Sequence, residues 1–140
     1  MRRHPAFHPV SRDHHSILLL ARHLRGEGRL RGGLAWQAWQ QAWPSLQRHL
    51  AHELDAILPL GVQTPAAAQP LADLAACDRA IHAAAHDPGQ QERLGELLRV
   101  HARLLEDRIL PAIQERLGDA ALASLADRLD IDSGLQACPI

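Results

Sequence analysis

The chain has 140 residues and a formal net charge of −1 with its ten histidines neutral, which suits one domain over residues 1–140 and argues against a broad nucleic-acid interface. Hydrophobic residues make up 46% of the chain but aromatic residues only 3%, so a core must consist mainly of Leu, Ala and Ile, which favours helices over strands. Two cysteines do not make a disulfide framework, and the absence of a signal peptide or a bilayer-length apolar run predicts a cytoplasmic protein with no membrane partner.

The spacing of the apolar residues predicts helices joined by short loops, and no segment alternates as a strand does. The expected fold class is all-α, an antiparallel up-down four-helix bundle with a short C-terminal extra helix. The bundle should occupy about residues 11–130 and leave flexible ends. In chain order the predicted helices cover residues 12–25, 34–60, 71–85, 91–117 and 120–129.

Turn-forming and capping residues define the boundaries of these helices. Residues 1–10 contain two prolines and are expected to be extended, and Ser11 can cap the first helix. Pro44 is expected to interrupt the second helix because it lacks a backbone N–H, with Ser45 capping the restart.

The second and fourth predicted helices repeat one pattern. In each, a His is followed about one turn later by a Glu and then by Ile-Leu-Pro. His49 and Glu53 are four apart and share a helix face, whereas His101 and Glu106 are five apart and lie on neighbouring sides of one turn. The repeat predicts a site shared between two halves of the bundle. The two segments are RHLAHELDAILPLG (48–61) and VHARLLEDRILPAI (100–113).

The other two main helices also carry polar residues on their inward side. Asp78 and His82 are four apart on the third helix, and His14 lies at the edge of the apolar stripe of the first, whereas His15 points well away from it. Burying such groups unpaired costs several kcal/mol each, and a bound cation removes that cost. The pattern predicts a metal site, with iron, manganese or zinc as candidate ions. The candidate ligands are His14, His49, Glu53, Asp78, His82, His101 and Glu106.

The remaining histidines and the tryptophans are interpreted as structural. Trp36, Trp39 and Trp43 are expected to pack the start of the bundle or to form a dimer contact, with an aromatic substrate site as the alternative. The histidines expected at the surface or in loops are His4, His8, His23, His52 and His86.

Four segments of the chain resemble the hemerythrin family, in particular its bacterial His-His-Glu cation-binding domains, over about residues 9–130. The resemblance implies one His ligand from the first helix, which is His14 here, or His15 if the register shifts by one residue. It also implies a His and a bridging Glu from the second helix (His49 and Glu53) and a His and a bridging acid from the fourth (His101 and Glu106). The segments are SRDHHSILLLARHLR (11–25), RHLAHELDAILP (48–59), LAACDRAIH (74–82) and VHARLLEDRILP (100–111).

The third helix departs from the family pattern. Asp78 stands where the family usually has a His, and the next ligand position falls on His82. The resemblance implies a carboxylate-bridged pair of non-haem iron ions, with zinc or manganese as alternatives. Asp78 then either binds iron in place of a His or leaves one metal weakly held.

The function implied by the resemblance is O₂ binding, O₂ sensing or iron handling, with a small ligand such as O₂ as the partner. One alternative is a di-iron enzyme acting on peroxide or nitric oxide. Another is a degenerate bundle that binds zinc, one metal or none and serves as an interaction module. A homodimer contact and an unidentified protein partner are further expectations.

Overall fold

The computed structural model describes residues 2–129, 133–138 and 140, and within them the fold is all-α, without a strand. Within the same residues, no helix combines the length and apolar character that crossing a membrane requires. The α-helices are α1 (His8–Leu24), α2 (Gly33–Ile57), α3 (Ala68–Ala84), α4 (Gln91–Arg103), α5 (Leu110–Arg116) and α6 (Asp119–Leu129). A π-helix, η5 (Leu104–Ile109), joins α4 to α5, and short 3₁₀ segments cover Pro5–Phe7, Leu58–Gly61, Pro65–Ala67, Pro88–Gln90 and Leu135–Ala137.

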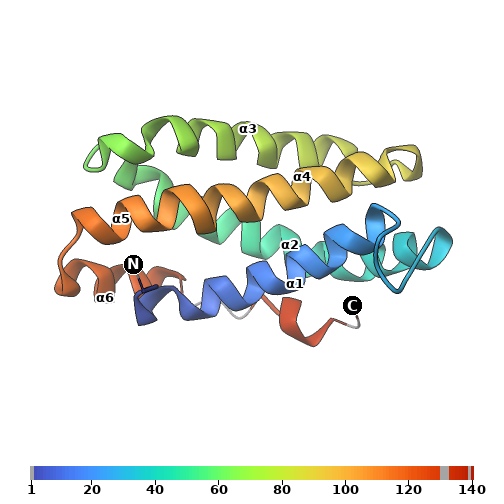
Figure 1. The fold of residues 1–140 in the computed structure, drawn as a ribbon, viewed down its shortest axis with the longest axis horizontal. Coiled ribbons are helices and arrows are strands. Elements are labelled where there is room, and N and C mark those ends of the chain that lie inside the picture. The colour runs from blue at the N-terminus through green and yellow to red at the C-terminus, as the bar shows by residue number, and fades with distance from the viewer. Residues whose placement is uncertain (1, 130–132, 139) are drawn as a thin grey trace.

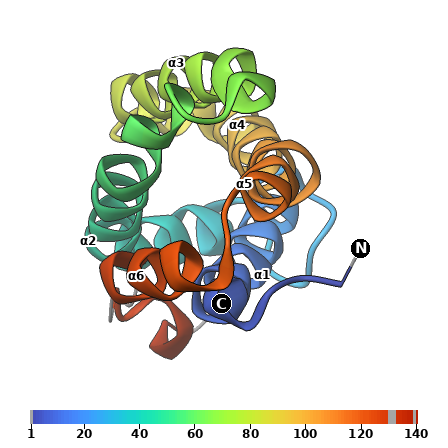
Figure 2. The same cartoon turned by 90° about the vertical axis from the view of Figure 1, so that its left-hand side faces the viewer.

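The long helices run side by side along the long axis of the molecule (Figure 1). Viewed along that axis, α1, α2, α3 and the α4–η5–α5 segment surround a common interior (Figure 2). Helix α1 packs against α2 and α4, and α3 packs against α4. Helix α6 lies against α2 and the Pro5–Phe7 turn, at the end of the molecule that holds the N-terminus.

A layer of polar side chains divides the buried apolar residues along the long axis. One apolar cluster contains Ile17, Trp39 and Leu98, and a second contains Phe7, Leu74 and Ile109. Between them α1 contributes Asp13 and His14, α2 contributes His49 and Glu53, α3 contributes Asp78 and α4 contributes His101, all buried. The polar layer is therefore enclosed by hydrophobic packing on both sides.

The first helix begins earlier than its sequence predicts. The expected extended lead-in is wrong, because a 3₁₀ turn starts at Pro5 and α1 starts at His8. Proline is tolerated in the first turn of a helix because the N–H it lacks has no helical partner there. Phe7 is fully buried and fixes this turn against the core. Ser11 does not cap the helix, because it lies within α1 and donates to Glu106 instead.

The predicted break at Pro44 is also wrong. Helix α2 continues through Pro44, which is exposed, from Gly33 to Ile57. At an exposed position water can hydrate the carbonyl group that loses its helical partner, so the helix continues at an energetic cost. The continuous helix fixes Trp43 and His49 on one rigid element.

The C-terminal residues that the structure describes pack against the helices. Leu135 is fully buried in the first apolar cluster. Arg48 of α2 donates to the backbone oxygen of Ser133 at 2.8 Å, and the Ser133 hydroxyl donates to Asp13 at 3.0 Å. This part of the expected flexible end is therefore tied to α1 and α2.

Candidate metal centre

Three imidazoles and one carboxylate converge in the polar layer. They are His14 from α1, His49 and Glu53 from α2, and His101 from α4, and each is at most 1% exposed. One ligand atom from each of the four lies within 4.8 Å of the others. A divalent cation fits such a set because neutral imidazole and carboxylate are its common ligands in proteins.

Glu53 lies at the middle of this cluster. Its Oε2 atom is 2.7 Å from Nε2 of His14 and 3.1 Å from Nε2 of His49. Its Oε1 atom is 3.0 Å from Nε2 of His101. The same nitrogen of all three rings therefore faces one point, which leaves the Nδ1 atoms on the outside.

Each outward Nδ1 atom meets a carboxylate. A carboxylate on the far nitrogen of a metal-binding imidazole fixes the tautomer, orients the ring and raises the basicity of the nitrogen that binds metal. All three imidazoles of the cluster have such a partner from a different helical element. The pairs are His14 with Glu106 at 2.7 Å, His49 with Asp13 at 3.0 Å and His101 with Asp78 at 2.7 Å.

The electrostatics of the cluster follow from its buried opposite charges. Burial alone lowers the pKa of His49 and of His101, but carboxylates outweigh it and raise the two pKa values to about 9 and about 10. Glu53 and Asp13 act on His49, and Asp78 and Glu53 act on His101. Burial raises the pKa of Glu53, yet His49 and His14 hold it well below its usual value. A cation takes the place of these protons when it binds.

Several buried atoms of the cluster make no well-aligned hydrogen bond, although each lies within 3.1 Å of an oppositely charged group. They are Nε2 of His49, Nε2 of His101 and Oε1 of Glu53, and all three face the centre. Buried polar atoms without a well-aligned hydrogen bond are costly, and a group of them around one point is a place where a cation can bind. The residues present therefore fit a cation.

The seven candidate ligands that the sequence predicts take three different positions in the structure. His14, His49, Glu53 and His101 form the cluster, and His14 is buried whereas the alternative, His15, is exposed. Asp78 and Glu106 contact the outer nitrogens of the histidines. His82 is exposed, bonds through Nδ1 to the backbone oxygen of Asp78 at 2.8 Å and packs its ring edge against Trp43.

Sequence reasoning missed Asp13. Its carboxylate accepts from His49, from the Ser133 hydroxyl at 3.0 Å and from the Gln136 amide at 3.1 Å. The one signal in the sequence is its position beside His14, which places it near the same side of α1. Its partner on another helix and its partners in the C-terminal segment cannot be recognised from sequence spacing.

The other expected structural roles are partly met. Trp39 is fully buried, Trp43 nearly so, and the rings of Trp36, Trp39 and Trp43 stack in sequence along α2. The expectation that His23 lies at the surface is wrong, because it is buried under the loop that follows α1.

These features define an all-α protein with a buried His–Glu cluster that is able to hold a metal ion. No family model matches the sequence, and neither a curated protein nor a solved structure shows significant similarity to it.

Proposed function

We propose that this chain is a metal-binding protein that holds one divalent transition-metal ion among His14, His49, Glu53 and His101. The contacts that the surrounding carboxylates make support a single ion. Asp78, Glu106 and Asp13 each contact an Nδ1 atom, so they serve the ligands of a single centre. A carboxylate-bridged iron pair would need Asp78 or Glu106 to leave its Nδ1 contact, and His82 to leave the backbone oxygen of Asp78. The arrangement of the long helices supports a four-helix bundle as the scaffold.

We propose ferrous iron as the physiological ion. Three imidazoles and one carboxylate suit iron, manganese and zinc, and an octahedral ion keeps coordination positions beyond these four ligands. Zinc with the same ligands would be tetrahedral and closed, which is the pattern of a structural site. An ion with open positions supplies a place where an external ligand binds.

The burial of the cluster restricts which external ligand can reach the ion. All four ligand side chains are at most 1% exposed, and apolar residues pack on both sides of them. A small uncharged molecule such as O₂ can reach such a place through local fluctuations, whereas an organic substrate cannot. Binding or sensing of O₂ is therefore the function that we favour, with nitric oxide as a ligand of the same size.

The experiment is metal loading of the chain without oxygen, followed by analysis of iron per chain and a visible spectrum before and after O₂ is added. We expect one iron per chain and a spectral change on oxygenation. Two irons per chain would favour the di-iron centre of the hemerythrin type. Retention of zinc with no iron binding would contradict an iron protein and favour a closed structural site.

A matched pair of variants tests whether the iron binds at the His–Glu cluster. Glu53→Gln keeps the size of the side chain but removes the charged ligand, and we expect iron to be lost. Glu115→Gln makes the same chemical change at an exposed position and should bind iron as the parent chain does. Equal iron content in the two variants would overturn the assignment of the centre.

A further inference from the structure

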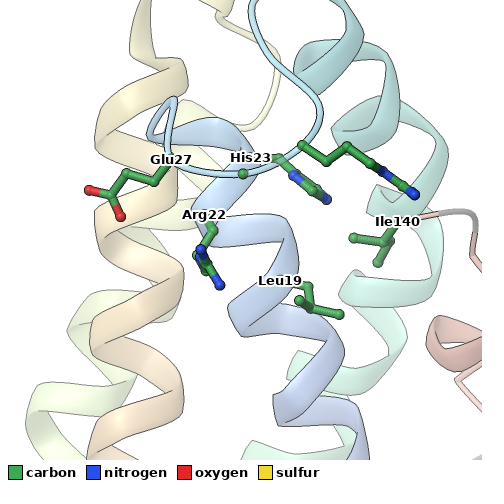
Figure 3. Close-up of a pocket in the computed structure, with 7 residues that line it drawn as sticks. Leu19, Arg22, His23, Glu27 and Ile140 are labelled. Atoms are coloured by element: carbon green, nitrogen blue, oxygen red, sulfur yellow. The ribbon is translucent and has the colours of Figure 1, made fainter.

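A pocket of about 360 Å³ lies at the C-terminal end of α1 (Figure 3), and none of the four metal-centre residues lines it. Its wall is formed by the last turns of α1, the loop that follows and Ile140. His23 in this wall follows His14 by nine positions, which is about 13 Å along an α-helix. The pocket is therefore a separate place from the His–Glu cluster.

His23 presents one ring nitrogen to this pocket. Its side chain is 6% exposed, and the Leu30 N–H donates to its Nδ1 at 3.3 Å, so the neutral ring carries its proton on Nε2. Within the part of the chain that the structure describes, Nε2 has no hydrogen-bond partner. The loop holds the ring closely, since a Cβ at Gly28 would lie 2.1 Å from Nδ1. Figure 3 shows the ring of His23 between Arg22 and Ile140.

Two guanidinium groups also line the pocket. Arg22 and Arg29 both line it, and neither forms an ion pair with another described residue. Glu27 lines it too, but its carboxylate pairs with Arg25 at 3.1 Å. Burial lowers the pKa of His23, and the positive charges of Arg29 and Arg22 lower it further, as expected where the three side chains line one pocket.

We propose that this pocket binds a small oxyanion, a phosphate or carboxylate group carried on a compact apolar body. Guanidinium groups recognise both anions through charge-assisted hydrogen bonds, and the Nε2–H of His23 supplies a further donor. The space exceeds what one phosphate group fills, and Leu19 and Ile140 give part of the wall an apolar surface. The anionic group should therefore face the arginines and His23, with the apolar body against Leu19 and Ile140.

The test is calorimetric titration with inorganic phosphate, phenyl phosphate and benzoate in chloride buffer of constant ionic strength. The parent chain should bind phenyl phosphate or benzoate more tightly than inorganic phosphate, because the ring buries apolar surface. An Arg22→Gln/Arg29→Gln variant should bind at least about tenfold more weakly. An Arg79→Gln/Arg128→Gln variant loses the same charge at exposed positions on α3 and α6 and should bind as the parent does.

Two outcomes would overturn the site. One is the absence of binding of all three anions to the parent chain. The other is an equal loss of affinity in both double variants, which would mean that net charge alone holds the anion. Preference for inorganic phosphate over both aromatic ligands would overturn the apolar part of the proposal.

The role of His23 can be tested with two amides. His23→Asn keeps an acceptor for the Leu30 N–H but removes the donor at Nε2, whereas His23→Gln can place an amide N–H near that position. We expect His23→Asn to lose about tenfold in affinity and His23→Gln to retain most of it. Circular dichroism and melting temperature report whether both variants fold. A folded His23→Asn that binds as tightly as His23→Gln would contradict the role of His23.

Discussion

The carboxylate of Asp78 is buried and lies 2.7 Å from Nδ1 of His101, whose Nε2 faces the centre. Removing its charge should weaken the hold of His101 on metal, because a neutral amide raises imidazole basicity less than a carboxylate does. We expect Asp78→Asn to lower metal affinity by about 10- to 100-fold, measured by competition with a chelator. Asp73→Asn, at an exposed position on the same helix, is the control and should bind normally. Equal affinity of both variants would exclude a positioning role for Asp78.

Asp78 also illustrates which parts of the site the sequence predicts and which it does not. His49 and Glu53 were predictable because they share one face of one helix, and the repeat around His101 supplied the partner helix. The sequence also identified Asp78 as a polar residue on the inward side of its helix. It could not distinguish a metal ligand from a carboxylate on the outer nitrogen of His101. That distinction depends on the separation and rotation of two helices, which sequence spacing does not contain.

At the scale of single elements, the π-helix Leu104–Ile109 lies next to the centre and carries Glu106. In a regular α-helix, residues five apart such as His101 and Glu106 are about 140° apart around the axis. The π-helix begins at Leu104, so it changes the direction of Glu106 relative to the regular helix that carries His101, and Glu106 reaches His14 at 2.7 Å. Deleting the exposed Asp107 should restore an α-helix and turn Glu106 away from His14.

We expect the Asp107 deletion to lower metal affinity by about 10- to 100-fold, as loss of an outer carboxylate does, while the chain remains helical. Glu106→Gln removes the charge without changing the backbone and should give a similar loss. The measurement is metal titration beside circular dichroism. Unchanged affinity in a folded deletion variant would show that the π-helix has no part in building the centre.

Pro44 provides a second prediction for a single element. The helix around it was predictable from its apolar pattern, but its continuity was not, because the cost of proline depends on whether water reaches the freed carbonyl. Pro44→Ala should raise the free energy of unfolding by about 1–3 kcal/mol, measured in urea with metal removed. Gln41→Ala, also exposed on α2, should change it by only a few tenths of a kcal/mol. Equal effects of the two substitutions would mean that Pro44 does not lower the stability of the helix.

For the whole molecule, the polar layer connects stability to proton and metal binding. All-α composition predicted the class of fold, because a core of Leu, Ala and Ile forms amphipathic helices. The division of that core into two clusters around buried charges could not be predicted, since it depends on which ends of the helices adjoin. Without metal, protonated His49 and His101 neutralise the buried carboxylates, so folding and proton binding are coupled.

The sign of this coupling gives the last prediction. The folded pKa values of His49 and His101, about 9 and about 10, lie above the unfolded value of 6.5. Their stabilisation is therefore complete below about pH 6.5 and is lost as the pH rises through 9 to 10. The lowered pKa of Glu53 affects stability at acidic pH. Its contribution to the free energy of unfolding is lost as the pH falls below about 4.5. The metal-free chain should be most stable between about pH 5 and 7.

Bound metal should reverse the alkaline trend, because its imidazole ligands must be deprotonated and its affinity rises with pH. Melting temperatures with a chelator and with saturating zinc should therefore diverge from pH 6 to pH 9. Glu53→Gln should flatten the alkaline decline of the metal-free chain, whereas the exposed His52→Gln should leave it unchanged. A metal-free stability that is constant or rises over this range would show that His49 and His101 are not held protonated by the carboxylates around them.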